Sequence, residues 1–426
     1  MAKRGTSTVV PKLRFPEFRV AGAWTTIELR QLSEFVTERV GTTDCTPYTV
    51  SAGVGLVSQQ EKLGRTIAGN SLKNYIVLQT NDFAYNKSAT KAFPQGFIAR
   101  YVGEGRAAVP NSIFTCFRTN DDLIDPTYLD NLFSTNLHGN WLRNRIAVGA
   151  RAHGSLNVSD EDLMDLPVPL PAGPSSLTEQ QKIADCLKSL DEVIATQGRK
   201  VETLKAHKRG LMQQLFPLKG EARPRLRFPE FRNAPEWGKR PLGQVIEVAS
   251  GQVDPTKSPY CDMPHVGGEN IECETGNLVG LKSAREDGVV SGKYLFDERD
   301  VLYSKIRPAL NKTAAPDFKG ICSADIYPIR PSNSEITRHF LIHLLRSAGF
   351  VEYATKHSAR GKIPKINREA LAAYAAPLPR PAEQNRIADC LTSLDAQITA
   401  ESDQLTALKT HKQGLMQQLF PAPESC

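Results

Sequence analysis

The chain has 426 residues, of which 40% are hydrophobic and 23% are charged, and its formal net charge is +7. This length predicts two to three domains with buried cores, and no run approaches the roughly 18 apolar residues that a membrane span requires. The opening residues MAKRGTSTVV contain no apolar signal region. We therefore expect a globular protein of the cytoplasm without a membrane segment, and its modest basic excess is compatible with a polyanionic partner.

Cysteine usage indicates neither a disulfide framework nor a zinc site. The eight cysteines are scattered singly, without a C-x-x-C pair, and disulfides are rare in the cytosol. We expect buried thiols.

Two segments occur twice, which gives the order tag, domain, helix, tag, domain, helix. The tag PKLRFPEFRVAGAW ends at Trp24 and returns as PRLRFPEFRNAPEW, which ends at Trp237. Residues 179–217 and 383–421 are identical at about 23 of 39 aligned positions. A repeat of this size predicts a duplicated architecture with a pseudo-two-fold relation. The tags are 213 residues apart and the helices 204, so the segments between them differ in length.

The segment after each tag predicts a small domain of mixed structure. In the first copy, short β-type runs at residues 75–79, 96–102 and 113–118 alternate with Gly, Pro and Asn. A helical stretch follows at residues 127–146, and its counterpart in the second copy is at residues 337–357. We therefore expect the α+β class, with a small mixed α/β domain built twice.

A weak correspondence links the two domains through a D-x-x-Y-x-K element and a basic loop. NDFAYNKS at residues 81–88 aligns with RDVLYSKIRP at 299–308, and residues 149–157 align with residues 357–367. Basic side chains beside Ser, Asn and Gly are typical of contacts with DNA phosphates, although solvated loops carry similar charges. The candidate DNA contacts are Lys87, Lys91, Arg143, Arg151, His153, Lys305, Arg307, Arg360, Lys362 and Lys365.

The duplicated helical segments carry apolar residues at alternating steps of four and three. This spacing predicts a coiled-coil seam that faces a partner helix, and an ordinary amphipathic helix on a core is the alternative. The expected seam residues are Ile183, Leu187, Leu190, Ile194, Leu204 and Leu211 in the first helix, and Ile387, Leu391, Leu394, Ile398, Leu408 and Leu415 in the second.

Two seams of equal length in one chain are expected to pair with each other. A parallel pair would oppose Lys208 to Lys412, whereas an antiparallel pair opposes Lys208 to Leu394 and Lys412 to Leu190. The antiparallel arrangement lets each lysine stem lie on apolar surface while its ammonium group reaches water. We therefore predict two long antiparallel helices that separate the two domains, each roughly 57 Å long at 1.5 Å per residue.

The boundaries follow from helix start and stop signals. Thr178 with Gln181 resembles a capping box, Pro381 suits a first helical turn, and a Phe-Pro pair ends each helix. The expected divisions are a first domain with its tag at 1–177, a first helix at 178–217, a second domain with its tag at 218–381, a second helix at 382–421 and a tail at 422–426.

The sequence lacks the motifs of several enzyme classes. It contains no Walker A motif, no H-E-x-x-H, no paired Cys/His ligand set, no nucleophile elbow and no N-P-P-aromatic element. We therefore predict no catalytic residue, metal or cofactor in this chain. A nuclease with a dispersed acidic site at Glu298, Asp300 and Lys305 is an alternative, but that spacing is generic.

Four features are typical of one protein family. They are the LRFPEF…W tags, the P-L-P…E-Q…I-A-x-x-L-x-x-L-D-x-x-I entries at 167–194 and 377–398, the GLMQQLFP ends and the D-x-x-Y-x-K element. With them the chain resembles a specificity subunit of a type I restriction-modification system. The resemblance implies a non-catalytic DNA reader in which each of two target recognition domains reads one half of an asymmetric bipartite site, and the helices set the spacer.

The resemblance also implies the partners. They are double-stranded DNA, two methyltransferase subunits that bind S-adenosylmethionine, and two motor-nuclease subunits that use ATP and Mg²⁺, in a prokaryotic cytoplasm. Two other interpretations stay open: a symmetric coiled-coil scaffold that binds other proteins, and a specificity subunit that serves a methylase without a restriction partner.

Overall fold

The computed structural model describes residues 8–51, 53–146, 156–218, 220–358 and 363–421. The chain divides into two compact units, of which the first comprises Met1–Thr196 with Leu405–Cys426 and the second comprises Gln197–Gln404. The division falls inside two long helices, α6 (Ser176–Leu215) and α10 (Pro381–Leu419). Each unit therefore contains the start of one long helix and the end of the other.

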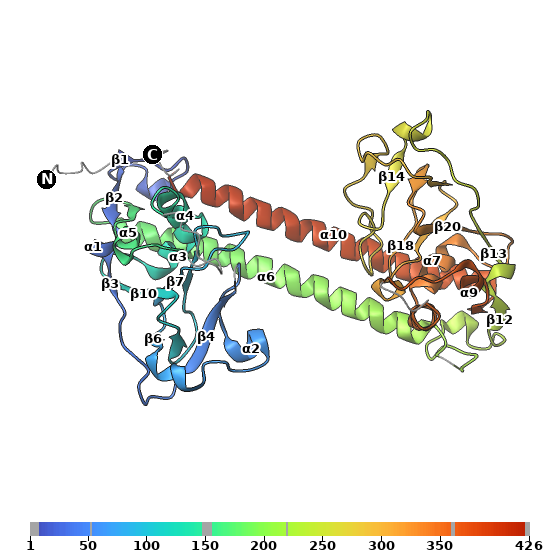
Figure 1. Cartoon of the computed structure of the whole chain (residues 1–426), viewed down its shortest axis with the longest axis horizontal. Coiled ribbons are helices and arrows are strands. Elements are labelled where there is room, and N and C mark those ends of the chain that lie inside the picture. The colour runs from blue at the N-terminus through green and yellow to red at the C-terminus, as the bar shows by residue number, and fades with distance from the viewer. Residues whose placement is uncertain (1–7, 52, 147–155, 219, 359–362, 422–426) are drawn as a thin grey trace. The chain divides into compact units, whose positions relative to one another are not determined.

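The first unit is built on two four-stranded sheets and one smaller sheet (Figure 1). The first sheet is antiparallel, in the order β3 (Ser33–Phe35), β10 (Phe114–Thr119), β7 (Phe83–Asn86) and β8 (Phe97–Arg100). The second has the order β5 (Gly55–Ser58), β4 (Thr46–Ser51), β9 (Ala107–Val109) and β6 (Ile76–Leu78), with a parallel β4–β9 pair. The smaller sheet joins β1 (Thr8–Val9), β2 (Trp24–Glu28) and β11 (Pro167–Leu170).

Alternation along the central strands places a helical layer on one face of the first sheet and the second sheet on the other. Phe83 and Tyr85 of β7 pack into a core with the helices, whereas Ala84 between them belongs to the core shared by the two sheets. The helical core is rich in aromatic contacts, such as Phe83 stacked on Phe117 at 5.1 Å. The helices of this unit are α1 (Leu29–Leu32), α2 (Gln59–Leu63), α3 (Pro126–Ser134), α4 (Leu137–Leu142), α5 (Asp160–Met164), η1 (Pro16–Phe18) and η2 (Gly69–Asn74).

The second unit repeats the topology of both four-stranded sheets. One sheet has the order β13 (Ile246–Val248), β20 (Ile326–Pro331), β17 (Val301–Ser304) and β18 (Thr313–Ala314). The other has the order β15 (Lys282–Ser283), β14 (Pro264–Val266), β19 (Gly320–Cys322) and β16 (Tyr294–Phe296), and again its β14–β19 pair is parallel. A two-stranded sheet joins β12 (Gly238–Pro241) and β21 (Ala375–Leu378).

The helices of the second unit are α7 (Arg338–Arg346), α8 (Ala348–Lys356), α9 (Arg368–Ala372), η3 (Pro229–Phe231), η4 (Leu242–Gln244), η5 (Tyr260–Asp262) and η6 (Pro308–Leu310). Of these, η5 and η6 have no counterpart at the equivalent place among the described residues of the first unit. In chain order, α7, α8 and α9 take the places of α3, α4 and α5. The predicted α+β class with an internal repeat is confirmed.

In each unit, a length of α6 lies antiparallel beside a length of α10. In the first unit, Lys412 binds the Asp191 carboxylate at 2.6 and 2.7 Å. In the second, Lys208 binds Asp395, and Gln197 donates to the Glu401 carboxylate at 2.7 Å. Residue numbers rise along one helix as they fall along the other, so the predicted antiparallel orientation is confirmed.

The environment of the two seam lysines differs from the prediction. Their ammonium groups do not simply reach water, because Asp395 follows Leu394 and Asp191 follows Leu190, and these carboxylates pair with the lysines. The Lys208 side chain is only 9% exposed, and burial lowers its pKa. Arg346 of α7 reaches the same Asp395 at 3.6 Å, so this seam carboxylate also ties the helix pair to the second domain.

None of the expected seam residues is exposed. Ile183, Leu187, Ile387, Leu391 and Ile398 are buried, and the other seven are half-buried. Some of these residues also contribute to the domain cores. Ile183 and Leu187 pack in the core of the first unit, and Ile387 and Leu391 pack in the core of the second.

Two local predictions need correction. Helix α6 begins at Ser176, so Thr178 lies inside the first turn instead of capping it, whereas α10 begins at Pro381 as expected. Cys273 is exposed, while the other thiols in the described part of the chain are buried or half-buried and none forms a disulfide. Within the described residues, no helix is long and apolar enough to cross a bilayer.

The tag of the first unit is fixed by a buried carboxylate to the N-terminal turns of α6, which we call the foot of the helix. Arg14 donates from Nε and Nη2 to the two oxygens of Glu179, at 2.6 Å each, and Trp24 donates from Nε1 to Glu179 at 3.3 Å. The Glu179 side chain is 1% exposed. The adjacent Gln180 accepts the backbone N–H of Asp125, the residue that caps α3. The foot of the helix therefore positions both the tag and the domain.

The second unit repeats these contacts on Glu383, which is also almost completely buried. Arg227 donates to its carboxylate at 2.7 and 2.6 Å, and Trp237 at 3.3 Å. Gln384 accepts the backbone N–H of Thr337, the residue that caps α7. The tags are thus explained by their contacts with the helix feet.

Each long helix ends in the core of the unit opposite to the one in which it begins. Leu215 and Phe216, at the end of α6, belong to the core of the second unit, where Phe216 stacks on Phe340 at 5.5 Å. Leu419 and Phe420, at the end of α10, belong to the core of the first. This explains the identical GLMQQLFP ends.

Replacing Arg14 tests the tag contact. Arg14→Met leaves the buried Glu179 carboxylate with the Trp24 N–H alone, and breaking a buried ion pair in this way costs about 3–5 kcal/mol. We expect the free energy of unfolding of the first unit to fall by that amount in urea titrations followed by tryptophan fluorescence. The matched control is Arg19→Met, an exposed arginine of the same tag, with an expected change of no more than about 0.5 kcal/mol.

The double variant R14M/E179Q should recover part of the loss, because no charge then stays buried. Equal stabilities for Arg14→Met and Arg19→Met would contradict this account of the tag.

Candidate nucleic-acid interface

The aspartate and tyrosine of the D-x-x-Y-x-K element are structural. Asp82 is completely buried and accepts two bonds from Arg118, at 2.7 and 2.8 Å, and one from the backbone N–H of Gln79. Tyr85 lies in the helical core, where burial raises its pKa. The element therefore fixes the turn before the central strand to its neighbour β10.

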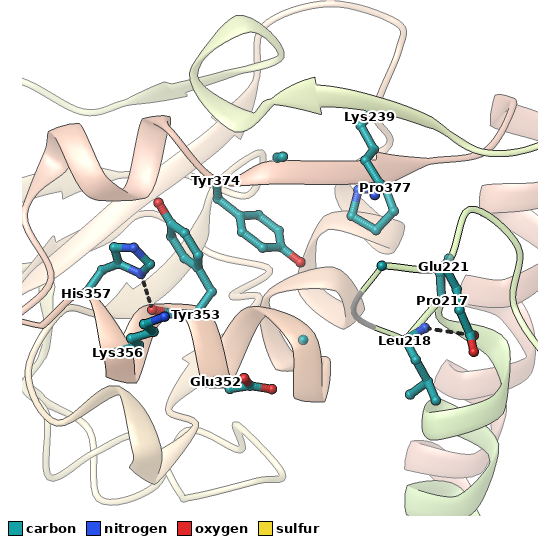
Figure 2. A pocket seen from close by; sticks show the side chains of 13 residues that line it. Pro217, Leu218, Glu221, Lys239, Glu352, Tyr353, Lys356, His357, Tyr374 and Pro377 are labelled. Carbon is teal, nitrogen blue, oxygen red and sulfur yellow. Dashed lines mark hydrogen bonds between the residues drawn. The ribbon is translucent and has the colours of Figure 1, made fainter.

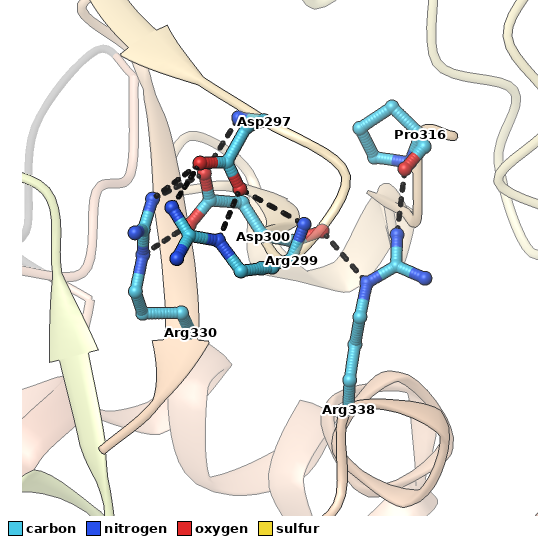
Figure 3. A network of polar contacts seen from close by, with 6 residues as sticks. All are labelled: Asp297, Arg299, Asp300, Pro316, Arg330 and Arg338. Atoms are coloured by element: carbon cyan, nitrogen blue, oxygen red, sulfur yellow. Dashed lines mark hydrogen bonds and ion pairs between the residues drawn. The ribbon is translucent and has the colours of Figure 1, made fainter. Parts of the chain in front are cut away.

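The equivalent aspartate of the second unit lies at the centre of a larger network (Figure 3). Asp300 accepts two bonds from Arg330 at 2.8 Å, and its backbone carbonyl accepts one from Arg338. Asp297 binds Arg299 at 2.6 Å, and this pairing lowers the Asp297 pKa to about 2. The guanidinium groups of Arg299 and Arg330 thus bind the two carboxylates, whereas Arg338 binds only backbone carbonyls.

This network argues against the acidic site of a nuclease. Both Asp300 oxygens are occupied by Arg330, and Lys305 points elsewhere, to the carbonyl of Ala324 at 2.7 Å. In the part of the chain that the structure describes, no group of three or more His, Cys, Asp or Glu side chains could hold a metal ion.

Three of the candidate DNA contacts are engaged within their own domains. Lys87 binds Asp160 at 2.7 Å, and Lys305 lies 3.4 Å from Asp325. Lys365 binds the same Asp325 at 3.0 Å. These lysines stabilise the ends of the central strands, and less of their charge is available to a partner.

Three other candidates are exposed, and no carboxylate lies within 4 Å of their charged groups among the described residues. They are Lys91 and Arg143 in the first unit and Arg307 in the second. Arg307 has a left-handed backbone with φ 47°, and its N–H binds the Pro364 carbonyl at 2.8 Å. The remaining candidates lie outside the described residues: Arg151, His153, Arg360 and Lys362.

The sequence places Arg145 and His357 among the charges of the two basic loops, but it does not show that each lies on an aromatic ring. Arg145, just after α4, lies over the ring of Trp141, and His357, just after α8, stacks on Tyr353. The signal was the spacing, since an aromatic residue is followed four positions later by a basic one, directly before each basic loop.

A cavity of about 250 Å³ lies beside the second of these stacks. Figure 2 shows its wall, which includes Tyr353 and His357 of the α8 region, Tyr374 before β21, and Pro217 after α6. This volume is below the range of about 300–1,000 Å³ that is usual for small-molecule sites, so we do not assign it a ligand.

Comparisons with known proteins give a consistent result. A family model for the type I restriction modification DNA specificity domain matches residues 235–410. The type I restriction enzyme EcoDI specificity subunit of Escherichia coli is 30% identical over 336 residues, which cover 73% of this chain and 71% of that protein. The MjaVIII specificity subunit of Methanocaldococcus jannaschii is 22% identical over 358 residues, or 81% of each protein.

Solved structures share the fold. The S subunit of a type I restriction-modification system from M. genitalium matches with a TM-score of 0.57 and 15% identity, covering 97% of this chain and 99% of that chain. A chain from a structure that addresses assembly and conformational transition of a type I system matches with a TM-score of 0.55 and 17% identity, covering 94% and 98%. Given the similarity to the E. coli subunit over most of both proteins, the chain belongs to the specificity subunits of type I restriction-modification systems, which recognise DNA sequence and are not catalytic.

Proposed function

We propose that each domain reads one half of an asymmetric, bipartite DNA site, and that α6 and α10 set the length of the unread spacer. The duplicated frame consists of the two tags and the helices α6 and α10. In this proposal, two methyltransferase subunits that bind S-adenosylmethionine dock on this frame and modify one adenine on each strand. Two motor-nuclease subunits that use ATP and Mg²⁺ complete the complex. The site of action is the cytoplasm of a prokaryotic cell.

The observation that carries the proposal is the contrast between the frame and the domains. The frame makes the same contacts twice, as the Arg14–Glu179 and Arg227–Glu383 pairs illustrate. The two four-stranded sheets of each domain share their strand order, but the domains match only weakly in sequence. Two identical partners can therefore use the frame, while two different surfaces can read two different sequences.

The antiparallel helices support the arrangement on DNA. In this proposal the two domains are related by a pseudo-two-fold operation, as the two strands of a duplex are. Equivalent surfaces of the two domains would then meet opposite strands, so two identical methyltransferases could act on one strand each.

Within each domain, we propose that exposed basic residues bind the DNA backbone. Arg307, Lys91 and Arg143 are the described candidates whose charge is not used by a carboxylate, and Arg151, His153, Arg360 and Lys362 stay predictions. Lys87, Lys305 and Lys365 are weaker candidates because of their ion pairs.

Shortening both helices together tests the spacer proposal. The variant lacks residues 194–200 and 401–407, which is one heptad from facing parts of the two helices. Because a whole heptad is removed, we expect the apolar residues to stay on the same helix face and both lysine–aspartate pairs to be kept. Seven residues correspond to about 10 Å of helix, or up to about three base pairs. The methylated motif should keep both half-sites and contain a shorter spacer, as read by base-resolution methylome sequencing.

The control is the removal of residues 194–200 alone, which leaves the helices unequal and should abolish methylation. An unaltered spacer in the doubly shortened protein would refute the role of the helices in setting it.

Replacing two neighbouring basic residues tests the backbone contacts. We expect Arg307→Ala to weaken binding and to reduce the slope of log K against log salt by about 0.9, because one phosphate contact is lost. Lys305→Ala should weaken binding by less, because its ammonium is held by Ala324 and Asp325. The measurement is the affinity for DNA, at several salt concentrations, of the complex with its methyltransferase. A wild-type slope for Arg307→Ala would show that Arg307 makes no phosphate contact.

A further inference from the structure

Helices α4 and α8 each present an aromatic side chain that is fixed at its polar end. Trp141 donates from Nε1 to the backbone carbonyl of Asp162 at 2.8 Å. Tyr353 donates its hydroxyl to the carbonyl of Ala370 at 2.9 Å. Asp162 and Ala370 are both the third residue of their helices, α5 and α9, so the two bonds are equivalent although the side chains differ.

A planar basic group lies on each of these rings. The Arg145 guanidinium carbon is 3.3 Å from the centre of the Trp141 ring. The ring centres of His357 and Tyr353 are 4.0 Å apart, with an interplanar angle of 27° (Figure 2). An aromatic face restricts the orientation of a planar group stacked on it, and it attracts the guanidinium cation of Arg145.

Each basic group also bonds to the backbone of the aromatic residue beneath it. Arg145 donates from Nη1 to the Trp141 carbonyl at 2.8 Å, and His357 bonds from Nδ1 to the Tyr353 carbonyl at 2.9 Å. A carbonyl can only accept, so Nδ1 carries the hydrogen and Nε2 is the nitrogen left for another partner. Three features thus occur twice: the fixed ring, the stacked group and the backbone bond.

A purely structural role explains only part of this arrangement. A basic group after the last turn of a helix interacts favourably with the helix dipole and with free carbonyls, but that role needs no aromatic support. Arg145 is half-buried and His357 is exposed, and neither has a carboxylate within 4 Å among the described residues. Within the described residues, the bonds of these two groups to the Trp141 and Tyr353 carbonyls leave the other donor edge of each without a hydrogen-bond partner.

The position of the stacks relates them to the DNA-contact candidates. The chain passes directly from each stack into the basic loop of its domain and is fixed again at the central strand, where Leu156 bonds to the Lys87 carbonyl and Ile366 to the Lys305 carbonyl. Both domains thus hold the two ends of this loop in the same way.

We propose that Arg145 and His357 are a matched pair of DNA-backbone contacts, one in each half-site, that are held ready by the aromatic rings beneath them. The ligand of each is a phosphodiester of duplex DNA. A guanidinium or imidazole that is already oriented loses less side-chain entropy when it binds a phosphate oxygen than a free side chain does. This inference rests on the proposed function, since it assigns one contact to each recognition domain.

Salt-dependent binding tests the pair, with the full chain in complex with its methyltransferase subunits. Arg145→Gln should reduce the slope of log K against log salt by about 0.9. It should weaken binding to target and random duplexes alike, because phosphate contacts carry no sequence information. His357→Arg should increase the slope by a similar amount, because it places a permanent charge on the same ring.

Two controls separate this role from others. Lys205→Gln removes one exposed charge from α6, where Lys205 pairs with Glu202, and should leave the slope unchanged. The second control is the thermal stability of each variant, measured on the same complex. Lower thermal stability of Arg145→Gln with a wild-type slope would identify a helix cap only and would overturn the proposal.

The failures of the two proposals are distinguishable. A wild-type complex that binds its methylated motif no better than random duplex would refute the proposed function. A complex that prefers its motif, but whose slope changes with neither Arg145→Gln nor His357→Arg, would overturn only the role of these two residues.

Discussion

The architecture depends on a buried carboxylate at the foot of each long helix. Glu179 and Glu383 are almost inaccessible to solvent, and an unpaired carboxylate in such a place would cost several kcal/mol. The tag must therefore return its arginine and its tryptophan to this point. Because the next residue, Gln180 or Gln384, binds the residue that caps the first helix of the domain, the same foot also fixes the domain. Tag, helix and domain are thus joined at one place in each unit.

The C-terminal ends of the two long helices also contribute to the cores of the two units. Each core includes the aromatic end of the helix that begins in the other unit, Phe216 in the second and Phe420 in the first. Neither core is complete without the other half of the chain, so the two halves depend on each other for folding. Within this closed frame, the surface of each domain can change without loss of the contacts that hold it. That freedom suits a protein whose task is to recognise different DNA sequences.

The sequence was sufficient for the frame, because the repeat, the heptad spacing and the seam lysines are local or directly comparable features. It was insufficient for the candidate interface, where charges depend on distant partners. Lys87 pairs with Asp160, which is 73 positions away, and no local pattern indicates that contact. The aspartates beside the seam, Asp191 and Asp395, were visible in the sequence, but their pairing with the lysines requires the side-chain positions. Arg145 and His357 were visible as basic residues, but their stacking was not, because the supporting residues, Trp141 and Tyr353, differ in type while they act alike.

The most direct test of the central claim is the methylome of a chain that carries the first domain in both positions. Residues 25–170 would replace residues 238–378, so that the Arg14–Glu179 and Arg227–Glu383 pairs of tag and helix are kept. If each domain reads one half-site in a frame with a pseudo-two-fold relation, the methylated motif should become symmetric, with the half-site of the first domain as an inverted repeat. A motif that stays asymmetric and unchanged, or that becomes a direct repeat, would contradict the account.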